Sequence, residues 1–418
     1  MYEIRTLSNG IKVVLENTPI FRSVSVGVFV KNGSRYEKIN ENGISHFIEH
    51  LLFKGTKNRN AKEIADAIDS VGGYINAGTT KEMTYYFTKT LDTHFSTSVD
   101  ILSDMYFNSL FEESAIEKEA NVILEEINMH EDYPDDLSYE ILTSKVFSDS
   151  SLGMAISGKK EIISKFRRND FINFFNRRYS TQNTVISIVG NIDFNKAIDL
   201  LEKQFGVFIN NDFKDINLSA TYNKSIVLKE KDIEQNHINI AFEGTAKNTL
   251  EYYDLAIFST LLGNGMSSIL NQKIREEKGL CYAIFSENTA YSDIGLFSIY
   301  TAVSESNTIQ TIELIENELS SLKRNLIDKD LLDKTKERLK SSYILSLESP
   351  SGRMLSMGSY LCQYGKIKTA DEILNNINCV TLDRLEATIN KVLDFTNMSI
   401  SAVGKVNSNI NKYIKEYK

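Results

Sequence analysis

A short strand-like stretch that occurs twice, late in each half of the 418-residue chain, most constrains how this chain can fold. NTVISIVGNI occupies 183–192 and NMSISAVGKV occupies 397–406, and each follows an amphipathic, helix-like segment. The glycines of the two stretches, Gly190 and Gly404, are 404 − 190 = 214 residues apart. We interpret this recurrence as an internal duplication, which predicts two halves of similar structure.

The length of the chain leads to the same division. A chain of 418 residues exceeds what one hydrophobic core usually supports, so at least two domains are expected. The segment 209–223, INNDFKDINLSATYN, is polar, rich in Asn and Asp, and without clear periodicity. We therefore predict a first domain over 1–208, a linker over 209–223 and a second domain over 224–418.

Periodicity in the first half predicts a mixture of strands and helices. Alternation of apolar and polar residues predicts strands at 11–16 and 23–30, and one or two further strands within 74–91. The helical period predicts four amphipathic helices, at 44–53, 61–73, 94–109 and 115–131. The expected fold class is α+β.

Charge, hydropathy and cysteine content limit the partners and the cellular location that we expect for this protein. The net charge of −9 disfavours nucleic acid as a partner, because phosphate binding needs a basic surface. No run approaches eighteen apolar residues and the first residues do not resemble a secretory signal, so we expect no membrane association and a cytoplasmic location. Cys281, Cys362 and Cys379 are odd in number and widely spaced, which predicts small buried side chains rather than disulfides or a thiolate zinc site.

The segment GISHFIEHLLFKGT, residues 43–56, carries the strongest chemical signal. His46 and His50 are four residues apart, so both imidazoles lie on one face of the predicted helix and can bind one metal ion. Glu49 lies at the neighbouring edge of that face, where a carboxylate can reach a metal-bound water without being a ligand. This is the inverted H-x-x-E-H motif of zinc peptidases.

A catalytic zinc ion needs a third protein ligand and an open fourth position. The acidic helix predicted over 115–131 is the place to seek that ligand. Glu119 and Glu126 are seven residues apart and share a face, and His130 lies one turn further on. Spacing alone leaves Glu126, Glu119 and His130 as alternatives.

Taken together, these residues resemble the pitrilysin/insulinase family of metallopeptidases, especially the branch that contains the mitochondrial processing peptidase β subunit and its bacterial relatives. The resemblance covers essentially the whole chain. In that family the third ligand follows the second motif histidine by the spacing found here, 126 − 50 = 76 residues, which implies Glu126. The resemblance also implies that Glu119 supports the site and that each chain holds one Zn²⁺.

Two further stretches extend the resemblance to substrate binding. Residues 263–300 are similar to the family's signature in the second half, which implies that Arg275 and Tyr282 bind the substrate backbone and stabilise the oxyanion. Residues 72–87 look like the family's active-site edge strand, which implies that Asn76 and Ala77 lie near the cleaved bond.

Two carboxylates bear on which peptide sequences would be cleaved. Asp136 and Glu140 fall where the resemblance to the processing peptidase places acidic groups that hold an arginine near the cleavage point. Their i, i+4 spacing on a helix would allow both to contact one guanidinium group. A solvated acidic turn after Pro134 explains the same residues equally well.

The resemblance implies a complete architecture and activity. Each half would be an antiparallel sheet with helices packed on one side, and one chain would form half of a clamshell that encloses peptides as a homodimer, with a heterodimer possible. The expected activity is that of a zinc endopeptidase cleaving unfolded peptides or precursor segments. The alternatives are a catalytically silent peptidase-like subunit that binds peptides or a partner chain, and an unrelated metal hydrolase, which the match in the second half disfavours.

Overall fold

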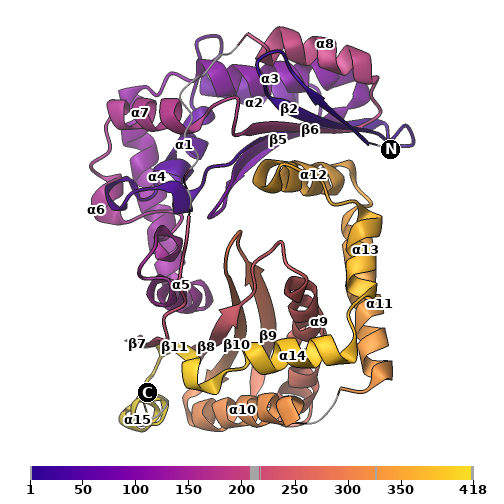
Figure 1. Cartoon of the computed structure of the whole chain (residues 1–418). Coiled ribbons are helices and arrows are strands. Elements are labelled where there is room, and N and C mark those ends of the chain that lie inside the picture. Colours follow the sequence, from indigo (N-terminus) through magenta and orange to yellow (C-terminus); the bar gives the residue numbers. More distant parts are fainter. Residues whose placement is uncertain (1, 208–215, 217, 325–326, 416–418) are drawn as a thin grey trace. The chain divides into compact units, whose positions relative to one another are not determined.

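Two mixed β-sheets, each backed by helices, form the framework of the protein (Figure 1). The computed structural model describes residues 2–207, 216, 218–324 and 327–415. Most of the predicted linker, residues 209–215 and 217, lies outside the described residues. The chain divides into two compact units, each assembled from three segments. Unit 1 comprises Met1–Ile127, Met154–Asn217 and Leu345–Lys368, and unit 2 comprises Asn128–Gly153, Leu218–Ile344 and Thr369–Lys418.

The sheet of unit 1 has six strands in the order β1-β2-β6-β3-β5-β4. Their bounds are β1 Tyr2–Thr6, β2 Lys12–Asn17, β3 Ser23–Val30, β4 Tyr74–Thr79, β5 Thr84–Leu91 and β6 Thr184–Gly190. Neighbouring strands run antiparallel except for β2 and β6, which are parallel. The strands predicted within the first half are therefore confirmed, and β4 ends the sheet.

The sheet of unit 2 has five strands in the order β7-β11-β8-β10-β9. Their bounds are β7 Ile226–Glu230, β8 Gln235–Gly244, β9 Cys281–Ala290, β10 Gly295–Ser304 and β11 Ser399–Gly404. The order and the single parallel pair, β7 with β11, repeat those of β2-β6-β3-β5-β4. The predicted duplication is thus present as two sheets of matching topology, each with one parallel pair where only antiparallel pairing was predicted.

The two glycines of the recurring stretch end equivalent strands, β6 and β11. Gly190 has φ +155° and Gly404 has φ +145°, in the region of backbone conformation that favours glycine. A Cβ on Gly190 would lie 2.4 Å from the carbonyl oxygen of Ser23, and one on Gly404 would lie 2.8 Å from that of Gln235. The same close approach of a neighbouring strand explains why glycine occurs at both positions.

Helices cover one face of the first sheet as a layer and pack against the inward-facing valines of β3, such as Val24, Val26 and Val28. Figure 1 shows α2, α3 and α8 on this face. The helices whose residues join this core are α1 Ile44–Leu52, α2 Ala61–Asp69, α3 Phe95–Asn108, α4 Glu113–Asp132, α6 Lys160–Ile163, α7 Arg168–Arg178 and α8 Phe194–Phe205. All four predicted helices are present, with ends that differ by a few residues.

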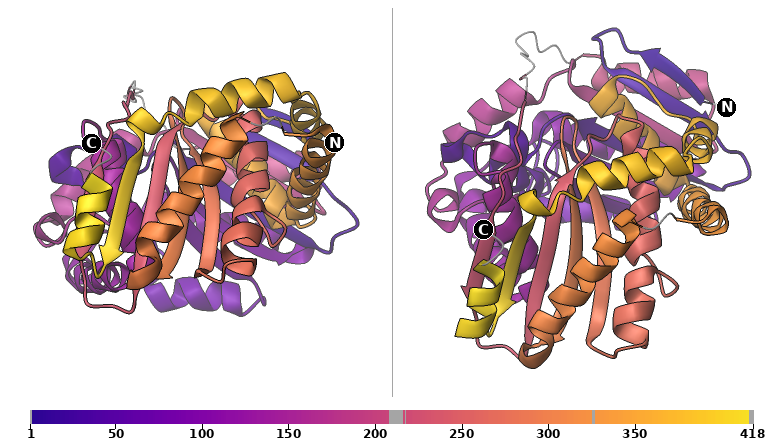
Figure 2. Two further views of the ribbon diagram at one scale, coloured as in Figure 1. Left: turned by 90° about the horizontal axis from the view of Figure 1, so that it is seen from below. Right: turned by 60° about the horizontal axis from the view of Figure 1, so that its bottom comes forward.

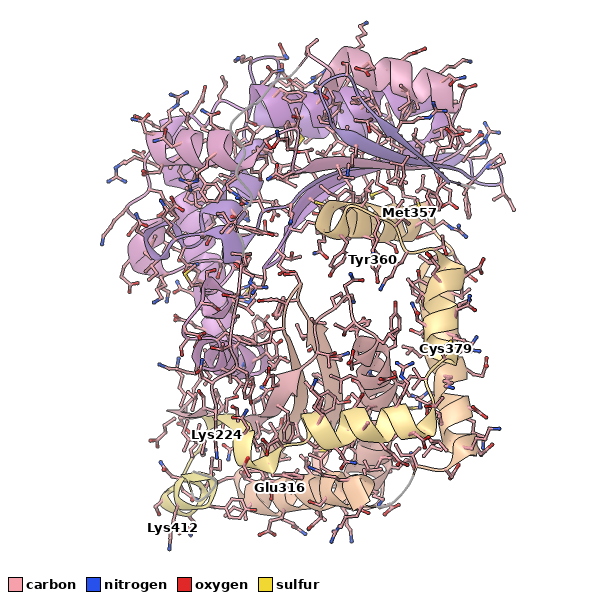
Figure 3. The ribbon with its side chains drawn as sticks, viewed as in Figure 1. Lys224, Glu316, Met357, Tyr360, Cys379 and Lys412 are labelled. Carbon is pink, nitrogen blue, oxygen red and sulfur yellow. The ribbon has the colours of Figure 1, made fainter. Side chains whose placement is uncertain are left out.

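The opposite face of the first sheet is covered by α12, Pro350–Tyr364, which comes from the second half of the sequence. Met354 and Leu361 of this helix pack against Phe29 and Val185 of the sheet. Figure 3 labels two of its side chains, Met357, which also packs against this cluster, and Tyr360. The prediction of helices on one side of the sheet describes the main layer and does not include this second one.

The second sheet is built in the same way. Its helical layer contains α9 Glu251–Gly263, α10 Thr308–Arg324 and α14 Leu382–Val392, and Figure 2 shows α10 and α14 crossing in front of the strands. Its other face is covered by α5, Pro134–Val146, from the first half of the sequence. Ser138 of α5 accepts a hydrogen bond from Asn239 of β8 and, through its carbonyl oxygen, one from Ser401 of β11. Each sheet thus takes one covering helix from the other half of the chain.

The remaining helices of the second half are α11 Lys329–Ser346, α13 Ala370–Asn378 and α15 Ser408–Lys415. Among the described residues, no helix combines the length and apolar character that crossing a bilayer requires. The three cysteines are free thiols. Cys281 and Cys362 are buried as predicted, whereas Cys379 (Figure 3) is exposed, so that part of the prediction is wrong.

Candidate active site

A buried carboxylate holds the start of α1, the helix that carries the H-x-x-E-H motif. Gly43, with φ +95°, precedes the helix and offers no side chain to cap it. The side chain of Glu37 instead accepts hydrogen bonds from the backbone N–H groups of Gly43 and Ser45, both at 2.8 Å, and from the Asn42 amide at 3.2 Å. It thereby satisfies N–H groups that a helix N-terminus leaves unpaired. Burial raises the pKa of Glu37 to about 7.

A second buried contact fixes α1 from behind. The Asn32 amide donates a hydrogen bond to the Ser45 hydroxyl oxygen at 3.1 Å, and the Arg178 guanidinium donates to the Asn32 side-chain oxygen at 3.0 Å. Arg178 is buried and lies over the ring of Tyr36, 4.4 Å from its centroid. Charge-assisted and cation–π contacts of this kind lock the first turn of α1 against the sheet.

The two motif histidines and one glutamate of α4 converge. The imidazole rings of His46 and His50 lie 4.7 Å apart between centroids. The two carboxylate oxygens of Glu126 lie 3.7 Å from the Nε2 atoms of His46 and His50, one on each. One possible ligand atom from each of the three residues lies within 4.8 Å of the others. Two imidazoles and a carboxylate are a donor set that suits Zn²⁺, so the residues present fit this ion.

Glu119 lies directly behind His50. Its carboxylate contacts the His50 Nδ1 at 3.2 Å and the Lys54 ammonium group at 2.7 Å. A carboxylate on the far nitrogen of a histidine fixes the ring and its tautomer, which leaves Nε2 of His50 as the atom that could bind a metal ion. Sequence reasoning missed Lys54, although its position four residues after His50 was a usable signal. His130, the remaining alternative ligand, lies beside Asp136, with Nδ1 3.4 Å from its carboxylate.

Glu49 is half-buried at the C-terminal half of α1 and is anchored to the edge strand β4. The Thr79 hydroxyl donates a hydrogen bond of 2.6 Å to its carboxylate. Burial raises the pKa of Glu49 above its ordinary value, although the Thr79 hydrogen bond and His50 act in the opposite direction. A carboxylate whose pKa is raised toward neutrality is a better general base than an ordinary surface glutamate.

The two predicted substrate residues of β4 point to opposite faces of the sheet. Ala77 lies on the same face as Thr79, which contacts Glu49. Asn76 lies on the other face, where its amide donates a hydrogen bond of 2.6 Å to the Tyr74 hydroxyl oxygen. The outer edge of β4 is the end of the six-stranded sheet. Only Ala77 therefore has its side chain on the face of the candidate base.

Arg275 and Tyr282 lie together in unit 2. The Arg275 guanidinium carbon lies 5.5 Å from the centroid of the Tyr282 ring, and the tyrosine is 80% exposed, which excludes a core role. Arg275 lies in a π-helical turn, Asn271–Glu276, and Tyr282 in β9. The structure brings these two residues together, and their role at the metal stays a prediction.

Asp136 and Glu140 are both exposed on α5 of unit 2, one helical turn apart. The Asp136 carboxylate lies beside His130, as described above. The predicted joint contact with a substrate arginine stays a prediction.

Comparison with known proteins identifies the family. Residues 12–160 match the family model described as insulinase, peptidase family M16, and residues 165–339 match the model described as the peptidase M16 inactive domain. The chain is 38% identical over 405 residues to an uncharacterized zinc protease, YmxG, of Bacillus subtilis, covering 96% of this chain and 99% of the relative. The chain belongs to peptidase family M16. An uncharacterized zinc protease of Rickettsia felis is 35% identical, with 96% and 97% covered.

Solved structures of other proteins share the fold. A protease from Helicobacter pylori aligns with a TM-score of 0.90 at 25% identity, over 97% of this chain and 99% of that one. A chain of complex III from Candida albicans aligns with a TM-score of 0.86 at 19% identity, over 99% of both chains. The M16 match in the first half contains the H-x-x-E-H motif and Glu126. The narrower likeness to the processing peptidase β subunit stays a prediction.

Proposed function

We propose that this M16 chain is a zinc-dependent endopeptidase that cleaves unfolded peptides or precursor segments. The observation that carries the proposal is the convergence of His46, His50 and Glu126 beside Glu49. The Glu49 carboxylate in turn accepts a hydrogen bond from Thr79 of the edge strand β4. A metal triad, a separate carboxylate and a free strand edge are what hydrolysis of an extended peptide requires.

The residues divide the chemical work. His46, His50 and Glu126 would hold one zinc ion, and Glu119 with Lys54 would keep His50 oriented toward it. When bound, zinc lowers the pKa of a coordinated water to about 7 and polarises the peptide carbonyl. Glu49 would take a proton from the attacking water and return it to the leaving amine, a role that its raised pKa favours.

The predicted substrate-binding residues would act on the peptide backbone and on one side chain. An extended peptide would pair with the outer edge of β4, so that its backbone is held whatever its sequence. Arg275 and Tyr282 would contact the substrate backbone and the developing oxyanion, and Asp136 with Glu140 would hold a basic side chain near the cleaved bond. We further propose a cytoplasmic enzyme that acts as a homodimer, or as a heterodimer with a related chain.

A catalytically silent peptide-binding subunit is the second candidate. The match to a domain described as inactive in the second half and the likeness of fold to a complex III chain favour it. Against it stands the complete set of His46, Glu49, His50 and Glu126 in the first half, with their geometry intact.

Hydrolysis of a quenched fluorescent basic peptide by zinc-loaded protein tests the proposal. We expect the parent and Glu49→Gln to bind about one zinc per chain, and Glu49→Gln to lose about 10²- to 10⁴-fold in kcat/KM. Glu125→Gln, an exposed neighbour on α4, should retain both properties. His46→Ala should lose zinc as well as activity. A parent that binds zinc and cleaves no peptide would favour the silent subunit.

A further inference from the structure

A buried ion pair holds the turn between β4 and β5. The Arg35 guanidinium donates a hydrogen bond of 2.7 Å to the Glu82 carboxylate, and the two side chains are 1% and 7% exposed. Glu82 lies within residues 80–83, which join the edge strand β4 to β5. We call these residues the hairpin turn. Because a deeply buried charge needs a partner in place of water, the pair ties the hairpin turn to the segment that carries Arg35.

Backbone contacts join the same two segments. The N–H group of Arg35 donates a hydrogen bond of 2.8 Å to the carbonyl oxygen of Lys81, and that of Ser34 donates one of 3.3 Å to the carbonyl oxygen of Thr80. A Cβ on Gly33 would collide with this Thr80 oxygen, so the segments approach each other closely only because residue 33 is glycine. The ion pair therefore adds to a contact that the backbone already makes.

The hairpin turn also has bonds of its own. The N–H group of Thr80 donates to the carbonyl oxygen of Met83 at 2.7 Å, and the Thr80 hydroxyl oxygen accepts from the N–H group of Met83 at 3.0 Å. The Lys81 ammonium group donates to the carbonyl oxygen of Met154, which also belongs to unit 1. A turn with these internal bonds transmits the position of Glu82 to the end of β4.

The segment 33–37 holds α1 as well as the hairpin turn. Glu37, two residues after Arg35, accepts the hydrogen bonds at the start of α1 that are described above. The same helix carries Glu49, whose carboxylate accepts the 2.6 Å hydrogen bond from Thr79. Thr79 is the last residue of β4 and directly precedes the hairpin turn. One short segment therefore fixes the helix of the candidate base and the edge strand to each other.

We propose that Arg35 is a positioning residue of the proposed endopeptidase. Its ion pair with Glu82 holds the end of β4 so that Thr79 keeps its bond to the candidate base and a peptide paired with β4 lies at a fixed place beside that base. This inference rests on the proposed function. Arg35 is buried, so it acts through the hairpin turn and not on the substrate, and the three candidate metal ligands belong to α1 and α4.

Steady-state cleavage of the quenched fluorescent basic peptide tests this role. Zinc-loaded Arg35→Met should lose about 10- to 100-fold in kcat, because a misplacement of about 1 Å at the reacting groups has an effect of this size. KM should change by less than about threefold, since the strand edge that binds the peptide is retained. The variant should keep about one zinc per chain. A parental kcat in Arg35→Met would overturn the proposal.

A matched control and a double variant separate positioning from folding. Arg353→Met breaks the 2.9 Å ion pair between α12 and Glu16 of β2, in the same unit, and should keep the parental kcat. Arg35→Met leaves a buried carboxylate without its guanidinium, which destabilises the fold, whereas Arg35→Met with Glu82→Met replaces the pair by apolar side chains and should recover most of the stability. This double variant should still have the lowered kcat. Recovery of the parental kcat together with stability would overturn the proposal.

Coupling to Thr79 tests the route by which Arg35 acts. Thr79→Val removes the hydroxyl that donates to Glu49 and should itself lower kcat. If Arg35 acts through this contact, Arg35→Met combined with Thr79→Val should lose no more kcat than the more impaired of the two single variants. A merely structural role of Arg35 would instead multiply the two losses, and that result would contradict the proposal.

Amide hydrogen exchange distinguishes a failure of this inference from a failure of the proposed function. If the zinc-loaded parent cleaves no peptide, the proposed function fails, and exchange in the variant with both Arg35→Met and Glu82→Met then decides about Arg35. Exchange that is faster by about tenfold or more in β4 and the hairpin turn, with parental exchange in β3 and β6, supports the positioning role. Parental exchange in β4 and the hairpin turn overturns it.

Discussion

Glu37 is the residue whose chemistry is most altered by its position. It is 5% exposed, it accepts three hydrogen bonds at the start of α1, and its pKa is raised to about 7 from an ordinary 4.5. Between these two values the folded protein binds more protons than the unfolded chain. The free energy of unfolding should therefore fall as the pH rises from about 4.5 to 7, by up to about 1.4 kcal/mol per pH unit.

Urea unfolding of the zinc-free protein between pH 5 and about 8 checks this pH dependence. Glu37→Gln cannot titrate and should lose the part of the slope that Glu37 contributes. At low pH it should be less stable than the parent, because both oxygens of a protonated carboxyl group can accept a hydrogen bond, whereas the amide nitrogen cannot. Glu63→Gln, which changes an exposed capping glutamate of α2, should keep the parental slope. An unchanged slope in Glu37→Gln would contradict the assignment.

The sequence predicted the roles of some residues of the candidate site but not of others. His46, Glu49 and His50 are set by spacing within one helix, so their arrangement could be predicted. Spacing could not choose between Glu119 and Glu126, because both lie on one face of α4, and only the distances to His50 separate their roles. Glu37 reaches α1 from an irregular segment, and irregular segments have no periodicity from which such a contact could be predicted.

At the scale of elements, strands and helices followed their apolar periods closely. The recurring stretch also predicted the equivalence of β6 and β11, because both end in a glycine that a neighbouring strand approaches. The sequence could not predict which sheet α5 and α12 would each cover. An amphipathic helix shows which of its faces is apolar but not which sheet that face will cover, and these two helices each cover the sheet of the other half.

Gly358 shows how tightly α12 is fitted to the first sheet. A Cβ at this position would lie 2.2 Å from a ring carbon of Phe29, which is fully buried. Gly358→Ala should therefore lower the free energy of unfolding by about 1–3 kcal/mol through overpacking, although alanine in an open helix position stabilises by about 1 kcal/mol.

Urea unfolding measures the effect of this substitution. Ser356→Ala, on the same helix, controls for the helix propensity of alanine and should leave stability nearly unchanged. Phe29→Leu combined with Gly358→Ala should show favourable coupling, because the smaller side chain gives room to the new methyl group. A Gly358→Ala protein as stable as the parent would show that α12 is not closely packed on β3.

At the scale of the whole molecule, the compact units differ from the predicted domains 1–208 and 224–418 in two segments. Residues 128–153, with α5, belong to unit 2, and residues 345–368, with α12, belong to unit 1. A division made at a polar, aperiodic segment assumes that neighbours in sequence fold together, and the exchange of two helices breaks that assumption. The exchange was invisible in the sequence because nothing in the residue pattern of α5 or α12 indicates which sheet its buried residues cover.

The exchange of helices makes each half of the chain necessary for the other's core. Without α12, fragment 1–208 would expose the cluster around Phe29 and Val185, and its α5 would lack the strands that it covers. We therefore expect fragment 1–208 alone to bind a hydrophobic dye and to aggregate. A protein cleaved at a protease site inserted between residues 208 and 217 should instead remain one particle in size-exclusion chromatography.

Deletion of 345–368 supplies the control for the cleaved protein, because it removes α12 and leaves both sheets intact in sequence. A second fragment with this deletion should fail to keep fragment 1–208 in solution when the two are co-expressed, whereas the full second fragment should succeed. Separation of the cleaved protein into two folded monomers would contradict the exchange. The stability of the first half would then reside within residues 1–208, and α12 would be dispensable to the fold that positions His46, His50 and Glu126.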